Sequence, residues 1–354
     1  MQFMPEFGLA GAETMCENLT YELVDRGHKV IVVSLYDYHS PITERLEQHN
    51  VPLLYLGKKP GLDLPIIKKI RNIIKQYRPD ILHTHLYLLK YVVLAAAGLD
   101  VKGIVHTVHN IAQKENGSLD RHINKLFFKM KKAVPVALSD QIRSTITEVY
   151  ELPSGDIPVI FNGVPLPETA PVRTYERNGH LKLIHVGRYT DVKNHLALMQ
   201  AVVEIHREEP DIELNLYGAG ELKENIDAFI RENHAESYIF DNGLSDRIKD
   251  KLAASDIFVL PSKYEGMPMT IIEAMGAGLP IVASNVGGIP DMIDNGIDGL
   301  ICGTDTESIK TALLRLIRDK ELRKTTGTNA LRKAEKFSAS HMADAYEKLY
   351  FSLR

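Results

Sequence analysis

The chain has 354 residues, of which 44% are hydrophobic and 25% charged, and its net charge is −4 at pH 7. This length predicts two domains, and the nearly balanced charge argues against nucleic acid as the main partner. No apolar run approaches the ~20 residues of a membrane-spanning helix, and no secretory signal pattern is visible. Two distant cysteines, Cys16 and Cys302, favour reduced thiols in a cytoplasmic protein.

Apolar runs alternate with amphipathic stretches along the first half, which is typical of βαβ units on a parallel sheet. The expected strands are 2–4, 29–34, 51–56, 81–85, 103–109, 133–138 and 158–161, and the expected helices are 13–26, 64–77 and 88–97. Because the first strand is short, we expect the natural start to lie a few residues upstream. Residues 162–179 hold turn residues with little periodicity and are interpreted as a linker.

The same rhythm starts again after the linker. Strands are expected at 181–186, 213–217, 239–240, 257–261 and 281–283, and helices at 194–207, 222–232, 246–254, 307–318 and 320–336. The prediction is an α/β fold with two Rossmann-like, doubly wound parallel-sheet domains, 1–165 and 166–338, facing across a cleft. A C-terminal helix, 339–354, is expected to pack back towards the N-terminal domain.

The stretch Glu265–Glu273 follows a buried apolar strand and opens a helix, so that two carboxylates bracket a helix N-terminus. Pro268 suits the first helical position, where its missing N–H costs nothing. Because no capping residue precedes it, the first N–H groups are available to an anion. Ligands of open α/β sheets bind at such strand ends. The alternative is an ordinary connection with two surface glutamates.

Cations and glycines follow neighbouring strands. Arg188 and Lys193 lie directly after the strand 181–186 and are able to neutralise a diphosphate, although two solvated surface cations are the ordinary alternative. Gly218 and Gly220 follow the strand 213–217 and allow close backbone approach to a ligand. A tight turn explains this Gly-x-Gly equally well, and the chain has no dinucleotide fingerprint and no P-loop motif.

Histidines raise the question of a metal site. His83 and His85 are expected to point to opposite faces of their strand, so that they cannot chelate one ion, and the chain has no Asp-x-Asp pair. We therefore predict no metal and no cofactor. His109, at the carboxyl end of its strand, is better placed as a hydrogen-bonding group.

Two stretches of the first half are basic, namely residues 58–78 and 121–132. In the second of them, leucine, phenylalanine and methionine residues separate the cations. A solvated helix face explains most stretches of this kind. The sharper hypothesis is an amphipathic surface that touches anionic lipid headgroups.

Taken together, the motifs resemble the family 4 retaining glycosyltransferases, which have the two-domain GT-B fold. The resemblance covers nearly the whole chain. It depends on the Gly-rich loop 8–13, Arg26–His28, Thr107–His109, Asn162–Val164, Gly187-Arg188 with Lys193-Asn194, Gly218–Gly220, Ala254–Asp256, Glu265–Glu273 and Gly287-Gly288. The two glutamates eight residues apart, combined with the Arg/Lys pair in this order, are the most specific part.

The resemblance implies roles for matching positions. Arg188 and Lys193 would hold the donor diphosphate and stabilise charge on the departing nucleotide. Glu273 would bind the ribose, and Glu265 would contact the donor sugar without acting as a nucleophile. His109 would reach the donor from the other domain and would complete the catalytic set with Arg188, Lys193 and Glu265. The remaining donor-binding positions would be Gly11, Gly218, Gly220, Gly266, Met267, Pro268, Met269 and Thr270.

The resemblance further implies a metal-independent enzyme that moves a hexose or N-acetylhexosamine from a nucleotide sugar to a glycan. A UDP-linked donor is favoured because Met267-Pro268-Met269 replaces the Phe-Gly-Leu often seen in mannosyl and glucosyl enzymes. A lipid-linked acceptor in surface-polysaccharide synthesis, at the inner face of the membrane, is expected. The alternatives are an inactive GT-B partner subunit that binds nucleotide sugar, and a nucleotide-sugar epimerase of the same fold.

Overall fold

The computed structural model describes the whole chain except Leu9, Pro60, Leu62, Asn116, Glu168, Ala170, Val172, Arg177, Asn178 and Arg354. Single positions of the predicted loop 8–13, the basic stretch 58–78 and the linker 162–179 therefore lie outside the described residues. The chain divides into two compact units. The first comprises Met1–Pro165 with Ser338–Arg354, and the second comprises Leu166–Phe337.

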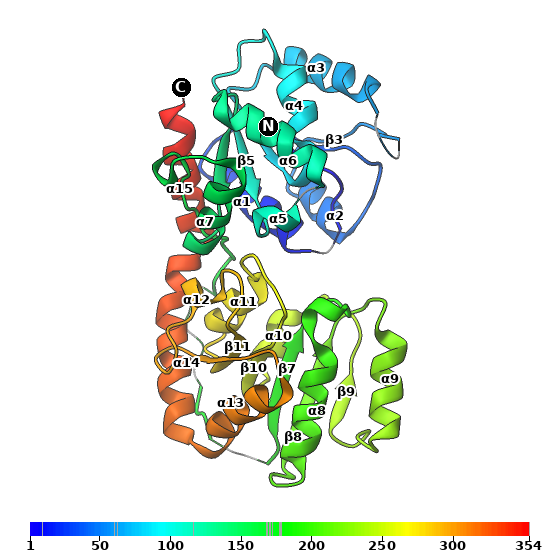
Figure 1. The fold of residues 1–354 in the computed structure, drawn as a ribbon, viewed down its shortest axis with the longest axis vertical. Helices are drawn as coiled ribbons and strands as arrows, with labels where there is room; N and C mark the ends of the chain where they lie inside the picture. Colours follow the sequence, from blue (N-terminus) through cyan, green and yellow to red (C-terminus); the bar gives the residue numbers. More distant parts are fainter. Residues whose placement is uncertain are drawn as a thin grey trace. The chain divides into compact units, whose positions relative to one another are not determined.

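The first unit contains a six-stranded parallel sheet in the order β3-β2-β1-β4-β5-β6. Helices lie around this sheet (Figure 1). Its strands are β1 (Gln2–Met4), β2 (Val32–Ser34), β3 (Leu53–Tyr55), β4 (Ile81–His85), β5 (Gly103–Val108) and β6 (Val134–Ala137). Its helices are α1 (Gly11–Asp25), α2 (Pro41–Gln48), α3 (Pro65–Tyr77), α4 (Leu89–Ala96), α5 (Ala112–Glu115), α6 (Ser118–Lys129), α7 (Asp140–Tyr150) and α15 (Ala339–Ser352). The 3-10 turns are η1 (Leu86–Leu88) and η2 (Ser154–Asp156).

The second unit repeats this architecture, with the sheet order β12-β11-β10-β7-β8-β9. Its strands are β7 (Leu181–Val186), β8 (Ile212–Tyr217), β9 (Ile239–Asp241), β10 (Ile257–Leu260), β11 (Ile281–Ser284) and β12 (Leu300–Cys302). Its helices are α8 (His195–His206), α9 (Lys223–Glu232), α10 (Ile248–Ala253), α11 (Met269–Gly276), α12 (Ile289–Met292), α13 (Thr306–Arg318) and α14 (Lys320–Ala334), with 3-10 turns η3 (Asp191–Lys193) and η4 (Glu335–Phe337).

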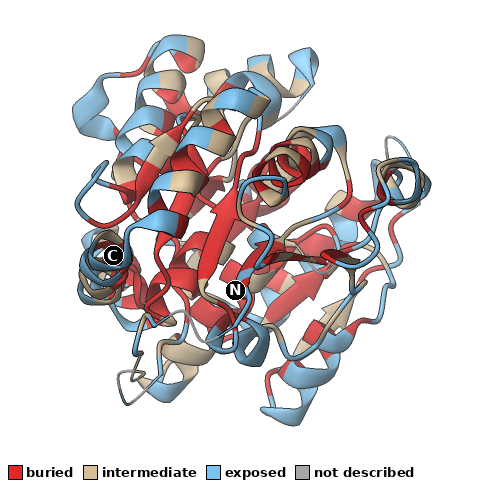
Figure 2. Cartoon of the chain, turned by 90° about the horizontal axis from the view of Figure 1, so that it is seen from below, coloured by how far each residue is buried: buried red, intermediate tan, exposed pale blue. Residues whose placement is uncertain are grey.

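Both sheets have the doubly wound order in which the chain runs outward from a central strand and then reverses. The prediction of two Rossmann-like domains is confirmed. The sheets are buried between helices: strand residues are mostly inaccessible, whereas the helices keep an exposed outer face (Figure 2). Continuous apolar strands such as β10 and β11 follow from this burial on two faces.

The C-terminal helix α15 packs against α1 within the first unit. Arg26, just after α1, reaches Asp344 at 2.5 Å and Glu347 at 2.6 Å, and Tyr346 is fully buried. The backbone carbonyl of Val164 accepts a hydrogen bond from Ala339 N at 2.9 Å. Tail and first unit therefore share one core.

Two predicted elements differ from the structure. The expected strand 158–161 forms only a single bridge, between Ala137 and Val159, because its chain leaves the edge of the sheet after one pairing. Pro268 is not the first helical residue: its ψ of 117° is extended, which makes it the N-cap of α11 and leaves Met269 as the first residue of the helix. The strand β12 and the helices α2, α5, α7 and α12 were not expected from the sequence pattern.

Candidate functional site

The site residues of the second unit gather where its sheet reverses direction. Neighbouring strands β7 and β10 are the first strands of the two halves of the sheet. Their carboxyl ends lead into the loops that carry Arg188 with Lys193, and Glu265. Since a crevice forms at this reversal in doubly wound sheets, the topology places these side chains at the expected ligand position.

Backbone hydrogen bonds fix the Arg188 loop on one side. Tyr189 N donates to Ala219 O at 2.8 Å, and Leu222 N donates to Tyr189 O at 3.0 Å. A Cβ on Gly218 would lie 2.0 Å from Gly187 O. The structure therefore gives Gly218 a packing reason, the close approach of two loops, in addition to any ligand contact. Gly220 likewise approaches the backbone of Tyr189.

Asn194 fixes the other side of this loop. Its backbone is left-handed, with φ of 59°, and its side-chain amide donates to Pro261 O at 3.0 Å and Thr304 O at 2.7 Å. These contacts link the end of η3 to the segments after β10 and β12. Lys193, the preceding residue, is held beside the Glu265 loop as a result.

Lys193 and Glu265 form an ion pair with 2.5 Å between Nζ and Oε1. Only 18% of the lysine side chain and 12% of the glutamate side chain are exposed, so solvent screens this pair less than a surface pair. Arg188 is exposed, and within the described residues its guanidinium makes no hydrogen bond or ion pair. The loop thus presents one paired and one available cation.

The N-terminus of α11 lies directly after Glu265 and has no side-chain cap. Gly266, Met267, Pro268 and Met269 are buried. The hydroxyl of Thr270 is also buried and finds no hydrogen-bond partner among the described residues. The unpaired Thr270 hydroxyl and the positive end of the helix dipole together favour an anionic ligand.

A second glycine approach supports this turn. Gly287 has φ of 56°, and a Cβ there would lie 1.6 Å from Glu265 O. The next residue, Gly288, donates its N–H to Gly266 O at 2.8 Å. The turn after β11 therefore holds the backbone of Glu265 and Gly266 in place.

Glu273 lies one turn into α11. Burial raises the pKa of its carboxyl group to about 7, and Lys249 only partly offsets this. A carboxylate in this position is costly until a ligand supplies hydrogen bonds.

Two predicted site residues belong to the first unit. Gly11 is the first residue of α1, whose N-cap Ala10 provides no side-chain hydrogen bond. His109 follows β5, is half-buried, and its backbone N–H donates to Glu115 Oε1 at 3.1 Å. Both lie at the carboxyl edge of their sheet, as expected from the sequence.

The expectation that His83 and His85 face opposite sides is wrong. Residues two apart on a strand share a face, and the ring centroids are 4.3 Å apart. The predicted lack of a metal is not thereby tested. Within the described ranges, no group of three or more His, Cys, Asp or Glu side chains is arranged to hold an ion.

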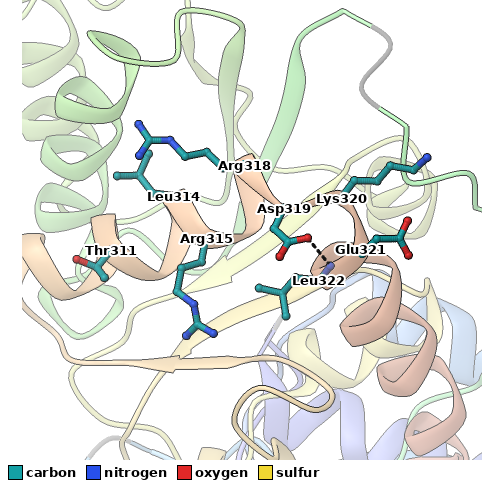
Figure 3. Close-up of a pocket in the computed structure, with 8 residues that line it drawn as sticks. All are labelled: Thr311, Leu314, Arg315, Arg318, Asp319, Lys320, Glu321 and Leu322. Carbon is teal, nitrogen blue, oxygen red and sulfur yellow. Dashed lines mark hydrogen bonds between the residues drawn. The ribbon is translucent and has the colours of Figure 1, made fainter.

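A surface hollow of the second unit is lined by none of the predicted site residues (Figure 3). It is lined by Thr311, Leu314, Arg315, Arg318, Asp319, Lys320, Glu321 and Leu322. Arg318 pairs with Glu208 at 2.8 Å, and Asp319 caps α14 by accepting from Leu322 N at 2.9 Å. Because these residues lie on the second half of α13 and at the start of α14, the hollow is a helix junction and not part of the site.

Sequence reasoning missed the residues that support the site. Asp241 accepts a hydrogen bond from the buried Tyr189 hydroxyl at 2.6 Å and pairs with Lys223 at 2.7 Å. Asn194 appeared only as part of a motif. A polar residue at a strand end and a lone buried tyrosine carry no pairing signal in the sequence, because Tyr189 and Asp241 lie 52 residues apart.

Comparisons with known proteins decide the family. The model for Glycosyltransferase Family 4 matches residues 9–167, and that for Glycosyl transferases group 1 matches residues 180–319. The UDP-Gal:alpha-D-GlcNAc-diphosphoundecaprenol alpha-1,3-galactosyltransferase of Escherichia coli is 30% identical, over 80% of this chain and 79% of its own length. The chain belongs to the family 4 glycosyltransferases.

Further similarities of this glycosyltransferase span its whole length. N-acetyl-alpha-D-glucosaminyl L-malate synthase of Bacillus anthracis is 27% identical over 98% of this chain and 94% of the relative. The structure of HepE from Anabaena in complex with UDP has a TM-score of 0.84 at 19% identity and covers 99% of both chains. The GT-B fold is thereby confirmed.

Proposed function

We propose that this glycosyltransferase is a metal-independent, retaining hexosyltransferase that takes its sugar from a nucleotide donor, with UDP favoured. The observation that carries the proposal is the cluster at the reversal of the second sheet. There the available cation Arg188 and the Lys193–Glu265 pair adjoin the uncapped start of α11. Such cations and N–H groups are able to neutralise a diphosphate leaving group without a metal ion.

We assign Arg188 and Lys193 to the donor diphosphate. In the structure Glu265 neutralises Lys193, so the diphosphate competes with a carboxylate for the same ammonium group. Glu265, once released, accepts hydrogen bonds from hydroxyl groups of the sugar. The ligand thereby redistributes a charge pair that is already in place, which limits the reorganisation that binding requires.

The other donor contacts follow along α11. The N–H groups of Gly266, Met267 and Met269 lie at the turn and are assigned to the phosphate and sugar. The buried Thr270 hydroxyl lacks a partner among the described residues, which supports a ligand contact. Glu273 is assigned to the ribose, whose hydroxyl groups would stabilise its buried carboxylate.

We assign Gly11, at the start of α1, to the phosphate or the sugar, and His109 to a hydrogen bond with the sugar. Gly218 and Gly220 are assigned to the donor through the Arg188 loop that they support. On this view the acceptor hydroxyl attacks from the face that the diphosphate leaves. The departing phosphate oxygen takes its proton, and no side chain acts as a nucleophile.

For the acceptor we propose a lipid-linked glycan of a surface polysaccharide, at the inner face of a membrane. The printed name of the Escherichia coli relative specifies a diphosphoundecaprenol-linked acceptor, which supports this choice. Among the described helices, none is both long and apolar enough to cross a bilayer. We therefore assign membrane contact to a surface, formed by the basic helices α3 and α6.

Thermal melting against UDP, GDP, ADP and their hexose and N-acetylhexosamine conjugates tests the donor. A ligand at 100 times its dissociation constant stabilises the fold by about 2.7 kcal/mol. We expect UDP and one UDP-sugar to raise Tm, and a lack of any shift contradicts the proposed donor site.

The configuration of a product tests the reaction. We expect slow hydrolysis of the cognate UDP-sugar to release the α-anomer first, as followed by NMR. Release of the β-anomer contradicts retention, and a donor recovered with inverted C2 identifies an epimerase instead. Binding without hydrolysis or transfer to any glycan identifies an inactive partner subunit. Full activity after chelation of divalent ions is expected, and loss of activity under chelation contradicts metal independence.

A further inference from the structure

A chain of polar side chains runs through the interior of the first unit to His109. It begins at Gln2 on β1, which is 2% exposed, and continues through His85 at the end of β4, which is fully buried. His85 Nε2 lies 3.2 Å from Gln2 Oε1, and His85 Nδ1 lies 2.9 Å from His109 Nε2. Only the last ring, that of His109, is partly exposed.

The orientation of the Gln2 amide gives this chain a direction. Gln2 Nε2 donates to Thr20 Oγ1 at 3.0 Å, and Oε1 is the acceptor for Cys16 Sγ at 3.5 Å. The same oxygen faces His85. Since a carbonyl oxygen only accepts, His85 Nε2 must carry the proton.

Both imidazoles are neutral at physiological pH. Burial lowers the pKa of His85 well below its usual value, and burial together with nearby His106 lowers the pKa of His109 to about 3. A neutral ring carries one N–H. His85 Nδ1 is therefore a lone-pair acceptor, and the hydrogen bond between the rings comes from His109 Nε2–H. The remaining nitrogen of His109, Nδ1, has no proton.

Neighbouring groups hold His85 in this orientation. The His83 ring lies against it, with centroids 4.3 Å apart, and is itself hydrogen-bonded to Tyr350 OH at 2.6 Å and Thr107 Oγ1 at 2.7 Å. Thr107 Oγ1 in turn lies 2.7 Å from Tyr346 OH. The C-terminal helix thus contributes two hydroxyl groups to the wall behind His85.

We propose that Gln2 and His85 are positioning residues that hold His109 as its Nε2–H tautomer, so that Nδ1 accepts a hydrogen bond from a substrate hydroxyl. That the hydroxyl belongs to a sugar rests on the proposed function, whereas the tautomer does not. With the opposite tautomer, His109 would offer an N–H, which also binds ethers and carbonyl groups. A fixed acceptor selects for groups that donate, such as free sugar hydroxyls.

Long-range ¹H–¹⁵N NMR of the ligand-free protein tests the tautomer directly. With His109→Gln used to assign its signals among the 14 histidines, we expect a protonated Nε2 and an unprotonated Nδ1. A protonated Nδ1 on His109 overturns the proposal. This measurement needs no activity and no altered Gln2.

Variants then test the role of Gln2. Gln2→Met removes the acceptor for His85, and we expect mixed His109 tautomers and a fall of about tenfold in kcat/KM. The matched control Tyr350→Phe removes a hydrogen bond to His83 only and should leave the His109 spectrum unchanged. An unchanged His109 spectrum in folded Gln2→Met overturns the role of Gln2.

The proposed function and the His109 tautomer can be contradicted independently of each other. The expected tautomer in a protein that no nucleotide sugar stabilises contradicts the proposed function and leaves the tautomer assignment standing. A wrong tautomer in a protein that does bind UDP-sugar contradicts this inference alone.

Discussion

The two cations of the candidate site, Arg188 and Lys193, differ in what they contact. These contacts determine how the loss of each side chain affects the reaction and the stability of the fold. Lys193 is paired with Glu265 in a mostly buried setting, and Arg188 is exposed without a partner among the described residues. Neither group supports a core. Their loss should therefore affect the reaction far more than the fold.

We expect Arg188→Ala and Lys193→Ala each to reduce transfer by about 100-fold or more, the usual effect of losing a group that stabilises developing charge. Tm should change little. Lys263→Ala is the matched control, because Lys263 pairs with exposed Asp191 at 2.5 Å in the adjoining loops. Steady-state kinetics with the cognate donor make the comparison, and near-normal turnover in either site variant would refute its assignment.

Glu265→Gln separates binding from transfer. The amide no longer neutralises Lys193, so the ammonium is free for phosphate, and we expect UDP to bind at least as tightly as in the parent protein. Transfer should nevertheless fall steeply because the sugar loses a charged acceptor. Calorimetric titration with UDP, alongside activity, checks this. Weaker UDP binding would show that Glu265 supports the diphosphate site in another way.

Glu273 makes stability depend on pH. Burial raises its pKa from 4.5 to about 7, so the folded state binds more protons than the unfolded state between these values. Stability contributed by this group is present at low pH and is lost as pH rises towards 7. We expect Glu273→Gln to be more stable than the parent by about 1–3 kcal/mol at pH 8, and little different at pH 4.

Urea unfolding at both pH values measures this difference. Glu115, whose pKa burial also raises to about 7, contributes a slope of the same sign to both proteins, so the difference isolates Glu273. A stability difference that does not vary with pH would show that Glu273 is not held protonated.

At the level of elements, the backbone at the start of α11 is held by a contact between two turns, the one that carries Glu265 and the one after β11. Gly287 allows the turn after β11 to approach Glu265. Any other residue at position 287 would be strained by the positive φ, and its Cβ would clash with the backbone oxygen of Glu265. The site is therefore sensitive to a residue that contacts no ligand.

We expect Gly287→Ala to lower the free energy of unfolding by more than 2 kcal/mol and to abolish UDP binding. Gly296→Ala is the matched control, since Gly296 has φ of 80° but open space around its Cβ position. It should lose only about 1 kcal/mol from strain and bind UDP normally. Equal effects in the two variants would contradict a role for the contact with Glu265.

The elements show how far the sequence was informative. Alternation of apolar strands and amphipathic helices predicted nearly every strand, because burial on both faces leaves a clear pattern. Residues 158–161 look like a strand but leave the sheet after one pairing, and composition does not record where pairing stops. The ends of strands 7 and 10 were predicted to carry the site. Asn194, Asp241 and Gln2 were missed because their partners are close only in the folded chain.

At the scale of the whole molecule, the basic helices α3 and α6 indicate which surface would contact a membrane. Helix α4 contacts both α3 and α6, so these two lie on one face of the first sheet. On α6 and just after it, Leu119, Leu126 and Met130 are more than half exposed. Glu151 neutralises Lys125 and Lys129 at 2.6 and 2.7 Å. Insertion of these apolar side chains into the bilayer should therefore contribute as much to membrane binding as the positive charge does.

We expect the protein to co-sediment with anionic vesicles at low salt and not with neutral ones. Leu119→Ser combined with Leu126→Ser should weaken this binding several-fold, since two exposed apolar side chains no longer insert. Leu244→Ser is the control, because Leu244 is comparably exposed, at 69%, in the second unit. No binding of the parent protein to anionic vesicles would contradict the membrane surface.

Because the C-terminal helix α15 belongs to the first unit, that unit cannot be completed until the end of translation. When residue 165 has left the ribosome, the first sheet is complete but lacks α15, whose Tyr346 is fully buried in the first unit. Another 189 residues, from 166 to 354, must be translated before that helix emerges. At roughly 5–20 residues per second this takes on the order of 10–40 s. During that interval His83 and Thr107 lack their partners on α15, so a message truncated within the second unit yields two unfinished domains.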